Sequence, residues 1–402
     1  MSHEDLPRPC PRVPARPGVS RCYGTRVRIA QVVPQGEQPW SGVLTVIVHL
    51  AAALAERGHD VEVWQLHEWE PDAYAEQRKR LVAAGVTQVP ILQERGVGRA
   101  AASLAGDRGI EVVHLHGAFN RSNTAVSRAL RHPYVFSPHS GYDPVSLERG
   151  RARKFVYRVL FERKMLEHAA LLVALTDAEL AQLRDVGATG PFAVIPNGVE
   201  PAPGDIDRRA FREEIGVAAD APLAVFVGRL DVHRKGLDVL VRGIADAPGW
   251  HLALVGPRFR DVERLEAIIA GLGVGDRIHL AGERHGRALL ESMGAADIFA
   301  MMSRWEGLPM ALLEAFSVAT PAVVSAAVGR SVDVEAAGAG WIVREGGLGP
   351  LLRTLMREGK RELAKRGRAA ILQSRSYDWR AVAERYEAIY EQAVGSDRTV
   401  KP

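Results

Sequence analysis

Short apolar runs alternate with segments of helical periodicity along nearly the whole of this 402-residue chain, and the complete pattern occurs twice. Alternation of this kind is typical of parallel sheets built from βαβ units. The first set of expected strands is RIAQVV, DVEVW, EVVHLH, YVFSP, LLVALT and FAVIP. After the turn signal PNG at 196–198, the second set is LAVFVG, HLALVG, RIHLAG, DIFAMM, AVV and GWIV. The sequence therefore predicts an α/β protein with two doubly wound, Rossmann-like domains.

The predicted domains span residues 27–198 and 199–375, and a C-terminal helix and tail occupy 376–402. Residues 1–26 are rich in proline and arginine and contain no apolar run. We interpret this opening segment as a flexible tail, because it has neither the apolar core of a signal peptide nor the pattern of a packed element.

The composition excludes several classes of protein. Hydrophobic residues make up 47% of the chain, which is enough to build full cores, and no stretch approaches the roughly 20 uncharged apolar residues that span a bilayer. The net charge of +4 is too small to indicate nucleic-acid binding. The only two cysteines, Cys10 and Cys22, fall before the first expected strand, so no disulfide framework is expected and a reducing cytoplasm is favoured.

Ligands of open parallel sheets bind at the carboxyl ends of the strands, so two such domains are expected to face each other across a deep cleft. Arg229 follows one expected strand directly, and Lys235 lies near the start of the next helix. Two cations beside a helix N-terminus suit a phosphate group, which the backbone N–H groups and the helix dipole also favour. A solvated basic turn is the alternative interpretation of this pair.

The segment SRWEGLPMALLEAF carries two carboxylates in otherwise mostly apolar surroundings. Pro309 is expected at the first helical position, which places Glu306 in the preceding loop and Glu314 between the first two turns. Gly307 lets a ligand approach the backbone closely because it has no Cβ. A diphosphate is therefore expected between this helix N-terminus and Arg229, with Glu314 beside the ribose. A capped core helix with one glutamate near its positive end is the alternative.

Two further residues are candidates on the first domain. His139 follows the strand YVFSP on the cleft side, where an imidazole can donate or accept a proton. A histidine that merely caps a turn explains this position equally well. Gly42 precedes the long first helix and is a second point at which a ligand could approach the backbone, although a single glycine is a weak signal.

Two pairs of residues resemble metal ligands but are incomplete. Asp205 and Asp207 lie in the expected linker and not at a strand end, whereas His114 and His116 alternate on one strand face without a third ligand. A metal site needs more ligands in suitable geometry, so we expect no essential protein-bound metal and no other cofactor.

The segment 148–168 mixes arginine and lysine with phenylalanine, valine and leucine. A basic helix of this composition can lie on an anionic membrane surface, which makes peripheral contact with the inner face of a membrane one expectation. An ordinary surface helix with a basic outer face is the alternative.

These motifs resemble the large family of retaining, nucleotide-sugar-dependent glycosyltransferases with two facing Rossmann-like domains, the GT-B fold, and specifically glycosyltransferase family 4. The most specific parts are GRLDVHRKGLDVL, SRWEGLPMALLEA, and SPHSGYDP followed by the basic segment. The resemblance covers essentially everything after the tail. It implies an inter-domain cleft and a C-terminal helix that crosses back to the first domain.

The resemblance also implies roles for the site residues. The family's two glutamates, eight positions apart, match Glu306 and Glu314, so that Glu314 would hold the donor ribose and Glu306 would approach the donor sugar. Arg229 and Lys235 match its diphosphate-binding pair, and His139 would lie beside the sugar across the cleft. The other donor-binding residues that it implies are Gly42, Gly307, Leu308 and Pro309. The family needs no metal.

The chain departs from the family pattern at three places. Ser41-Gly42 stands where the family often has two glycines, Ala319 stands two residues before Pro321 where it has a glycine, and Gly329-Arg330 replaces a pair of glycines. The first departure affects the geometry near the phosphates, and the others lie around a helix end and the following loop. None removes a charged group that the mechanism requires.

The expected function is transfer of a sugar from a nucleoside diphosphate sugar to an acceptor hydroxyl with retention, in polysaccharide, lipopolysaccharide or glycolipid assembly. The expected partners are that donor and a saccharide or lipid-linked acceptor, and not nucleic acid. First-domain loops around Gly42, Phe119 to Arg121 and Tyr142 would form the acceptor site. A nucleotide-sugar epimerase of similar fold and a non-catalytic nucleotide-sugar-binding protein are the alternatives.

Overall fold

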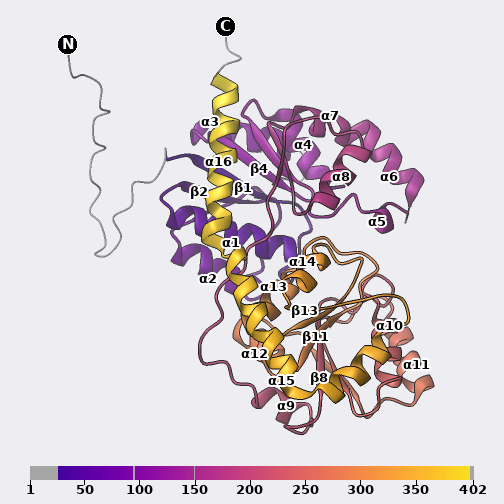
Figure 1. Ribbon diagram of the computed structural model, residues 1–402. Coiled ribbons are helices and arrows are strands. Elements are labelled where there is room, and N and C mark those ends of the chain that lie inside the picture. The colour runs from indigo at the N-terminus through magenta and orange to yellow at the C-terminus, as the bar shows by residue number, and fades with distance from the viewer. Residues whose placement is uncertain (1–25, 94–95, 149, 399–402) are drawn as a thin grey trace, which may run out of the picture.

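The computed structural model describes residues 26–93, 96–148 and 150–398, which form two α/β domains, one above the other in Figure 1. Nearly all of the predicted tail at 1–26, together with Cys10 and Cys22, lies outside these residues. No helix in the described part of the chain is long and apolar enough to cross a membrane.

The first domain contains a parallel sheet of seven strands in the order β3-β2-β1-β4-β5-β6-β7. The strands are β1 (Arg28–Val33), β2 (Asp60–Gln65), β3 (Thr87–Pro90), β4 (Val112–His116), β5 (Tyr134–Ser137), β6 (Leu171–Ala174) and β7 (Phe192–Val194). The helices are α1 (Gly42–Glu56), α2 (Ala75–Ala83), α3 (Val97–Asp107), α4 (Arg121–Ala129), α5 (Pro144–Glu148), α6 (Arg151–Tyr157), α7 (Arg163–His168) and α8 (Asp177–Asp185), and a π-helical turn, η1 (Arg158–Glu162), joins α6 to α7.

The second domain contains a parallel sheet in the order β10-β9-β8-β11-β12-β13. The strands are β8 (Leu223–Val227), β9 (His251–Val255), β10 (Ile278–Gly282), β11 (Ile298–Met301), β12 (Ala322–Ser325) and β13 (Gly340–Val343). The helices are α9 (Ala210–Glu214), α10 (Leu237–Ala245), α11 (Val262–Leu272), α12 (Gly286–Gly294), α13 (Met310–Ser317), α14 (Ser331–Ala336) and α15 (Leu348–Ser374), followed by a 3₁₀ turn, η2 (Arg375–Tyr377), and α16 (Trp379–Arg398).

Every predicted strand is present, so the prediction of two Rossmann-like sheets is confirmed. Strand β3 was missed because its sequence, TQVP, lies at the sheet edge, where partial exposure removes the demand for a continuous apolar run. The basic segment 148–168 is not one helix, because α6 begins only at Arg151 and the π turn interrupts its continuation. The predicted boundaries at 198 and 375 stay predictions.

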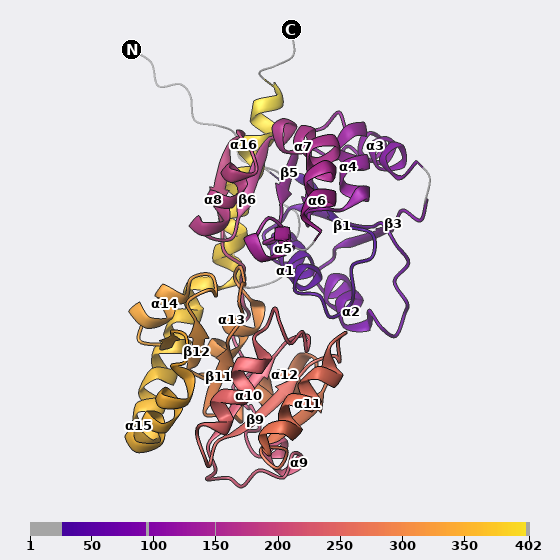
Figure 2. The same cartoon turned by 90° about the vertical axis from the view of Figure 1, so that its right-hand side faces the viewer.

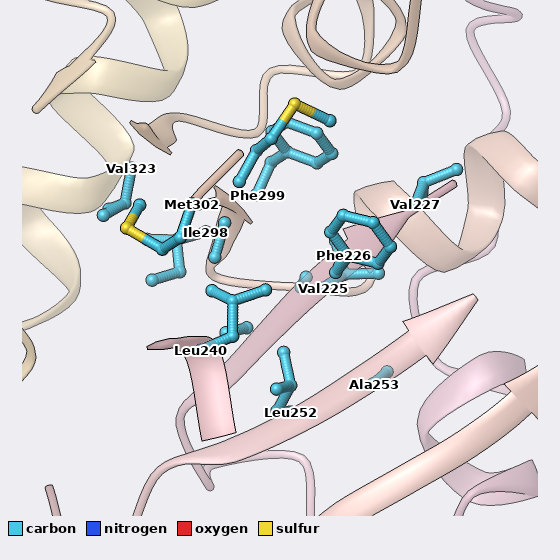
Figure 3. Packing of buried hydrophobic residues seen from close by; sticks show 14 of the residues in the cluster. Val225, Phe226, Val227, Leu240, Leu252, Ala253, Ile298, Phe299, Met302 and Val323 are labelled. Carbon is cyan, nitrogen blue, oxygen red and sulfur yellow. The ribbon is translucent and has the colours of Figure 1, made fainter. Parts of the chain in front are cut away.

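The second domain is held together by apolar side chains from both faces of its sheet. The strand register places Phe226 of β8 and Leu252 of β9 on one face of the sheet and Phe299 of β11 on the other (Figure 3). All three side chains are buried, as is Leu240 of α10, which belongs to the same apolar cluster. Strands that are covered on both faces need near-continuous apolar sequences, which explains why these runs were recognisable in the sequence.

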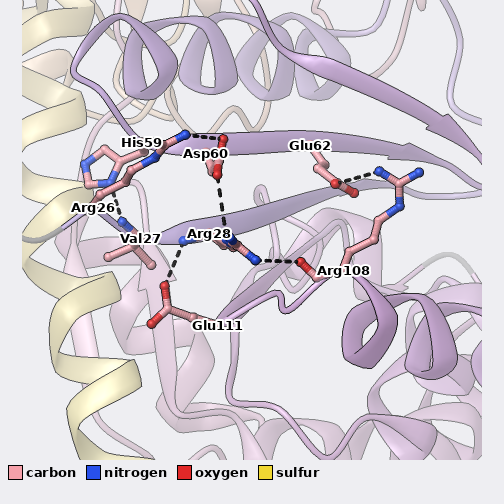
Figure 4. A network of polar contacts seen from close by, with 8 residues as sticks. All are labelled: Arg26, Val27, Arg28, His59, Asp60, Glu62, Arg108 and Glu111. Carbon is pink, nitrogen blue, oxygen red and sulfur yellow. Dashed lines mark hydrogen bonds and ion pairs between the residues drawn. The ribbon is translucent and has the colours of Figure 1, made fainter. Parts of the chain in front are cut away.

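Polar contacts fix the amino-terminal ends of the first strands, at the edge opposite the carboxyl ends (Figure 4). The backbone N–H of Val27 donates to His59 at 3.2 Å, and that of Arg28 donates to Glu111 at 3.0 Å. The guanidinium of Arg28 also donates to the carbonyl of Arg108 at 3.2 Å. These bonds align β1 with the loops before β2 and β4 without using any group at the ligand-binding edge.

The last helix, α16, crosses back from the second domain and packs along the first, as predicted (Figure 1, Figure 2). Trp379, Tyr386 and Tyr390 enter the same apolar core as α1 and β1. On the same helix, the carboxylate of Glu387 accepts hydrogen bonds from Arg57 at 2.6 Å and contacts His59 at 2.9 Å. The end of the chain is therefore a structural part of the domain with which the chain begins.

The contact between Trp379 and Gly198 predicts a local stability effect. A Cβ at residue 198 would lie 2.3 Å from the Trp379 ring, whereas a Cβ at Gly204 in the same linker would meet no atom within 4 Å. We expect Gly198→Ala to lower the free energy of unfolding by about 1 to 3 kcal/mol through overpacking, measured by urea denaturation. Gly204→Ala is the matched control, and equal stability of the two variants would contradict this packing.

Candidate functional site

In each sheet the strand order reverses between two neighbouring strands, β1 and β4 in the first domain and β8 and β11 in the second. Loops that leave the carboxyl ends of such a pair run to opposite faces of the sheet, which opens a crevice between them. Arg229 follows β8, Glu306 follows β11 and His139 follows β5, a neighbour of β4. All three side chains thus come from the edges where a ligand is expected.

Arg229 provides a positive charge that is not neutralised by hydrogen bonding. Its guanidinium lies 5.6 Å from the ring centroid of Trp40, in the first domain, and 5.1 Å from that of Phe259, in the second. The guanidinium group has no hydrogen-bond or ion-pair partner among residues 26–93, 96–148 and 150–398. Burial lowers its pKa, while the field of Glu306 and Glu37 opposes that shift. A half-buried guanidinium that contacts two aromatic rings and has no counter-charge bonded to it can bind an anion.

Lys235 and Glu306, which we predicted to serve different parts of a ligand, form an ion pair with each other. The Lys235 Nζ lies 2.5 Å from Glu306 Oε2, and the two side chains are only 12% and 15% exposed. The following Gly236 has a φ of 63°, and a Cβ there would lie 1.9 Å from the carbonyl oxygen of Met302, so only glycine fits. Separation of the two side chains would leave each charge largely buried and unpaired, which is unfavourable. The ion pair therefore holds both side chains in place.

Glu314 carries a carboxyl group that has no hydrogen-bond or ion-pair partner in the part of the chain that the structure describes. Burial raises its pKa to about 7, so its neutral and ionised forms coexist near neutral pH.

Helix α13 begins at Met310 and not at Pro309, because Pro309 adopts an extended ψ of 130° at the N-cap position. The helix therefore begins one residue later than the sequence predicted.

The turn at His139 is tightly constrained. His139 and Ser140 both have positive φ values, 50° and 62°. The buried carboxyl group of Glu179 accepts hydrogen bonds from the backbone N–H groups of Ser140 and of Leu175, the latter at 2.7 Å. Since residues that have a Cβ rarely adopt positive φ, the hydrogen bonds to Glu179 stabilise an otherwise unfavourable turn, and this turn sets the position of the His139 imidazole.

The loop around Gly307, for which we predicted binding of the donor substrate, contacts that turn directly. A Cβ at residue 307 would lie 1.7 Å from Ser140 Oγ, so the two domains meet here without room for a side chain. The carbonyl oxygen of the next residue, Leu308, accepts a hydrogen bond of 2.9 Å from Asn197 of the first domain. The Leu308 side chain itself is buried in a small inter-domain cluster, so only its backbone is available to a ligand.

Gly42 lies at the start of α1, where Ser41 Oγ accepts the backbone N–H of Val43 at 3.1 Å. It is exposed, and a Cβ added to it would meet no atom within 4 Å. No clash within the protein therefore requires glycine here. Glu37, in the same loop, is close enough to Arg229 for the arginine to lower the glutamate's pKa against the larger raising effect of burial.

The acceptor loop differs from its prediction at Tyr142. This side chain is buried, and its hydroxyl donates to Glu162 at 3.1 Å. The same carboxyl group accepts the backbone N–H of Phe119, whose φ is 58°, and burial raises the pKa of Glu162 to about 7. Tyr142 therefore supports the Phe119 loop from below and does not line an open surface.

Two departures from the family pattern fall at left-handed backbone positions. Ala319 has a φ of 62° and Arg330 a φ of 59°. Glycine adopts such angles without strain, which explains the family preference and shows that this chain accepts the conformation without it. Gly329, which the chain retains, is packed so closely that a Cβ would lie 1.6 Å from the carbonyl oxygen of Gly307.

The discounted metal pairs have other partners in the structure. Asp207 accepts the backbone N–H groups of Arg209 and Ala210, and Asp205 pairs with Arg287. Within residues 26–93, 96–148 and 150–398 there is no group of three or more histidine, cysteine, aspartate or glutamate side chains that could hold a metal ion.

Several residues at the site were missed by sequence reasoning. They are Trp40, Ser140, Glu179 and Phe259. Thr176 and Glu179 form the pattern T-x-x-E that marks a helix start, and Thr176 Oγ1 does accept the N–H of Glu179 at 3.1 Å. No sequence pattern shows that the glutamate side chain then reaches the turn after β5, because that contact depends on tertiary structure.

Solved structures share this two-domain arrangement. Sucrose-phosphate synthase from Thermosynechococcus elongatus superimposes with a TM-score of 0.73 at 19% identity, over 92% of this chain and all of that one. HepE from Anabaena, solved in complex with UDP and glucose, gives a TM-score of 0.73 at 19% identity, over 91% of this chain and all of that one. At these identities the similarity establishes the fold, which is GT-B.

Sequence comparison is more specific. The profile of "Glycosyltransferase Family 4" matches residues 40–202, and that of "Glycosyl transferases group 1" matches residues 207–368. A D-inositol 3-phosphate glycosyltransferase from Kineococcus radiotolerans is 31% identical over 94% of this chain and 96% of its own length. GDP-mannose:cellobiosyl-diphosphopolyprenol alpha-mannosyltransferase from Xanthomonas campestris is 25% identical over 93% and 99%. The chain is thus a transferase enzyme and belongs to glycosyltransferase family 4.

Proposed function

We propose that the enzyme transfers a sugar from a nucleoside diphosphate sugar to an acceptor hydroxyl with retention of the anomeric configuration. The observation that carries this proposal is the half-buried guanidinium of Arg229, which has no hydrogen-bond partner among the described residues and lies where the strand order reverses. A diphosphate supplies the missing acceptor oxygens. The N-terminus of α13, which follows the neighbouring strand, adds backbone donors.

In the proposed reaction the bond between the anomeric carbon and the diphosphate oxygen breaks, and the acceptor oxygen bonds to the same face of that carbon. The acceptor proton passes to the departing phosphate. Arg229 stabilises the charge that develops on the diphosphate, and Lys235 adds its charge. Glu306 is proposed as a positioning and electrostatic group, since its bond to Lys235 holds it in one orientation. No step requires a metal ion, and metal independence stays a prediction.

His139 is proposed to contact the donor sugar as a neutral imidazole. Burial lowers its pKa to about 4, so the ring is uncharged at neutral pH. One ring nitrogen, Nε2, lies 2.9 Å from His116 Nδ1, which leaves Nδ1 to form a hydrogen bond with a sugar hydroxyl. The contact of Ser140 with Gly307 supports this assignment, because it brings the His139 turn against the donor loop.

The similar proteins support a nucleoside diphosphate sugar as donor without specifying which one. The Xanthomonas enzyme is named for GDP-mannose and a diphosphopolyprenol-linked acceptor, and the Anabaena protein was also solved with UDP-glucose. The Kineococcus enzyme is named for inositol phosphate. We therefore propose a saccharide or lipid-linked acceptor in glycolipid or polysaccharide assembly.

We also propose that α6, η1 and α7 contact an anionic membrane, with Figure 1 showing α6 at the outer edge of the first domain. Five consecutive or nearly consecutive apolar side chains are exposed here: Phe155, Val156, Val159, Leu160 and Phe161. The basic residues around them are Arg151, Arg153, Lys154, Arg158, Arg163 and Lys164. The π turn buries Glu162 while Leu160 remains 59% exposed, and the exposed Glu167 of α7 pairs with Arg163, so the outward surface is mainly apolar and cationic. An anionic bilayer complements both properties.

The first prediction tests the diphosphate site. Arg229→Ala is expected to lower turnover by about 10²- to 10³-fold, because one preorganised charge contact with the leaving group is lost. Turnover is measured as nucleotide release over a panel of UDP-, GDP- and ADP-sugars, with and without acceptor, which also distinguishes transfer from epimerisation. Arg264→Ala, an exposed arginine of α11, is the control. Near-normal turnover in a folded Arg229→Ala protein would refute the assignment.

The second prediction concerns Glu314. Ribose hydroxyls that donate to its carboxylate favour the ionised form, so donor binding should lower a pKa that starts near 7. Binding then releases a proton near neutral and at mildly acidic pH, and affinity increases as the pH rises to about 7 and levels off above it. A nucleoside diphosphate sugar has no titrating phosphate in this range, so calorimetry in buffers of different ionisation enthalpy reports the protein proton. Glu314→Gln should abolish that release; undiminished release would exclude the role.

The third prediction tests the membrane contact. Leu160→Glu should reduce co-sedimentation with vesicles containing anionic lipid at least several-fold, because it places a negative charge in the apolar surface that faces the lipid. Leu372→Glu on α15 is the matched control, since that leucine is 60% exposed at a distant site. If both variants bind the vesicles like the unmodified protein, the apolar surface does not contact lipid.

A further inference from the structure

A series of hydrogen-bonded polar side chains, here called the relay, leads from His139 into the interior of the first domain and passes through Tyr390 of the last helix. His139 Nε2 lies 2.9 Å from His116 Nδ1, and His116 Nε2 lies 2.8 Å from Gln31 Oε1. The Gln31 amide nitrogen donates to the Tyr390 hydroxyl at 2.9 Å. That hydroxyl lies 2.7 Å from His114 Nδ1.

The relay ends at Ser137 Oγ of β5, which is 2.8 Å from His114 Nε2. Every side chain in this relay except His139 is fully or almost fully buried. Burial lowers the pKa of His114 and of His116 well below 6.5, so both rings are neutral. Polar groups at such depth are costly unless each one has a partner, and the relay supplies a partner at every step.

The direction of the hydrogen bonds follows from the orientation of the Gln31 amide. Its oxygen can only accept, so His116 must carry its proton on Nε2, which leaves His116 Nδ1 as an acceptor. His139 must then donate from Nε2, and its Nδ1 is left unprotonated. At the other end, Tyr390 accepts from the amide nitrogen and donates to His114. Rotation of the amide by 180° would reverse each of these donors and give the other tautomer of His139.

We infer that Tyr390 is a positioning residue for the transfer reaction: its hydroxyl joins the Gln31 amide to His114, so that His139 cannot change from the Nε2–H tautomer unless the amide and the protons of Tyr390 and His114 reverse with it. This inference rests on the proposed role of His139 toward the donor sugar. The tautomer matters because His139 Nε2 is bonded to His116, so the tautomer determines whether the remaining Nδ1 accepts a hydrogen bond from a sugar hydroxyl or donates one.

Tyr390 belongs to α16, which comes from the far end of the chain and is the helix that crosses back onto the first domain. Its hydroxyl lies between Gln31 of β1 and His114 of β4, the two strands at which the order of the first sheet reverses. The docking of the C-terminal helix therefore completes the hydrogen-bonded interior behind His139, in addition to filling an apolar core.

Tyr390→Phe tests this inference, because it keeps the buried ring and removes only the hydroxyl. Nitrogen NMR of histidine-labelled protein, with the His139 signals assigned by their loss in His139→Asn, should show one protonated and one unprotonated ring nitrogen in the unmodified enzyme. In Tyr390→Phe the two His139 nitrogens should move toward averaged shifts. The turnover number should fall about tenfold, while the KM for the donor changes less than about twofold.

Tyr386→Phe is the matched control. Tyr386 is buried one turn earlier on the same helix, and its hydroxyl interacts with Ser137 at the end of the relay, without linking Gln31 to His114. This variant should keep the His139 tautomer and the turnover number. A single Nε2–H tautomer of His139 in Tyr390→Phe would overturn the inference. The NMR result needs no substrate, so it remains decisive even if no nucleoside diphosphate sugar is turned over, which would refute the proposed function instead.

Discussion

The return of α16 to the first domain is the constraint on which most of this structure depends. The helix starts where the Trp379 ring packs against Gly198, at the crossing between the domains, and continues along α1. Its apolar side chains fill the core under β1, and Glu387 is bonded to Arg57 and His59. Because α15 packs in the core of the second domain and α16, which follows it, packs in the core of the first, the chain crosses between the two domains a second time.

The loops and the helix that follow β8 and β11 carry charged side chains in two different states. Lys235 and Glu306 neutralise each other in a pair that is largely shielded from water, whereas Arg229 lies between two aromatic rings without a hydrogen-bonded counter-charge among the described residues. Burial disfavours an isolated charge, as the lowered pKa of Arg229 and the raised pKa of Glu314 show. An anionic diphosphate and a hydroxyl-rich ribose would relieve both costs, which supports the proposal of a nucleoside diphosphate sugar as donor.

Much of the fold was predictable because strands covered on both faces must be apolar throughout, and turn residues separate them visibly. The same rule explains the failure at β3, where an edge position tolerates TQVP. The candidate site was predictable in outline, since Arg229, Glu306 and His139 each follow a strand. The ion pair of Lys235 with Glu306 was not, because their positions are 71 residues apart and no local pattern links them.

The strands, the order of the two domains and the charged residues after strand ends were all predictable from the amino-acid sequence, because they depend on local periodicity and on the rule that ligands bind at strand ends. Which of these groups come into contact depends on how distant segments pack together. The fold placed Ser140 against Gly307, buried Tyr142 against Glu162, and connected His139 to Tyr390 through a relay in which Gln31 and Tyr390 lie 359 positions apart in the sequence. Such contacts arise from packing between distant segments, and no local sequence pattern encodes their geometry.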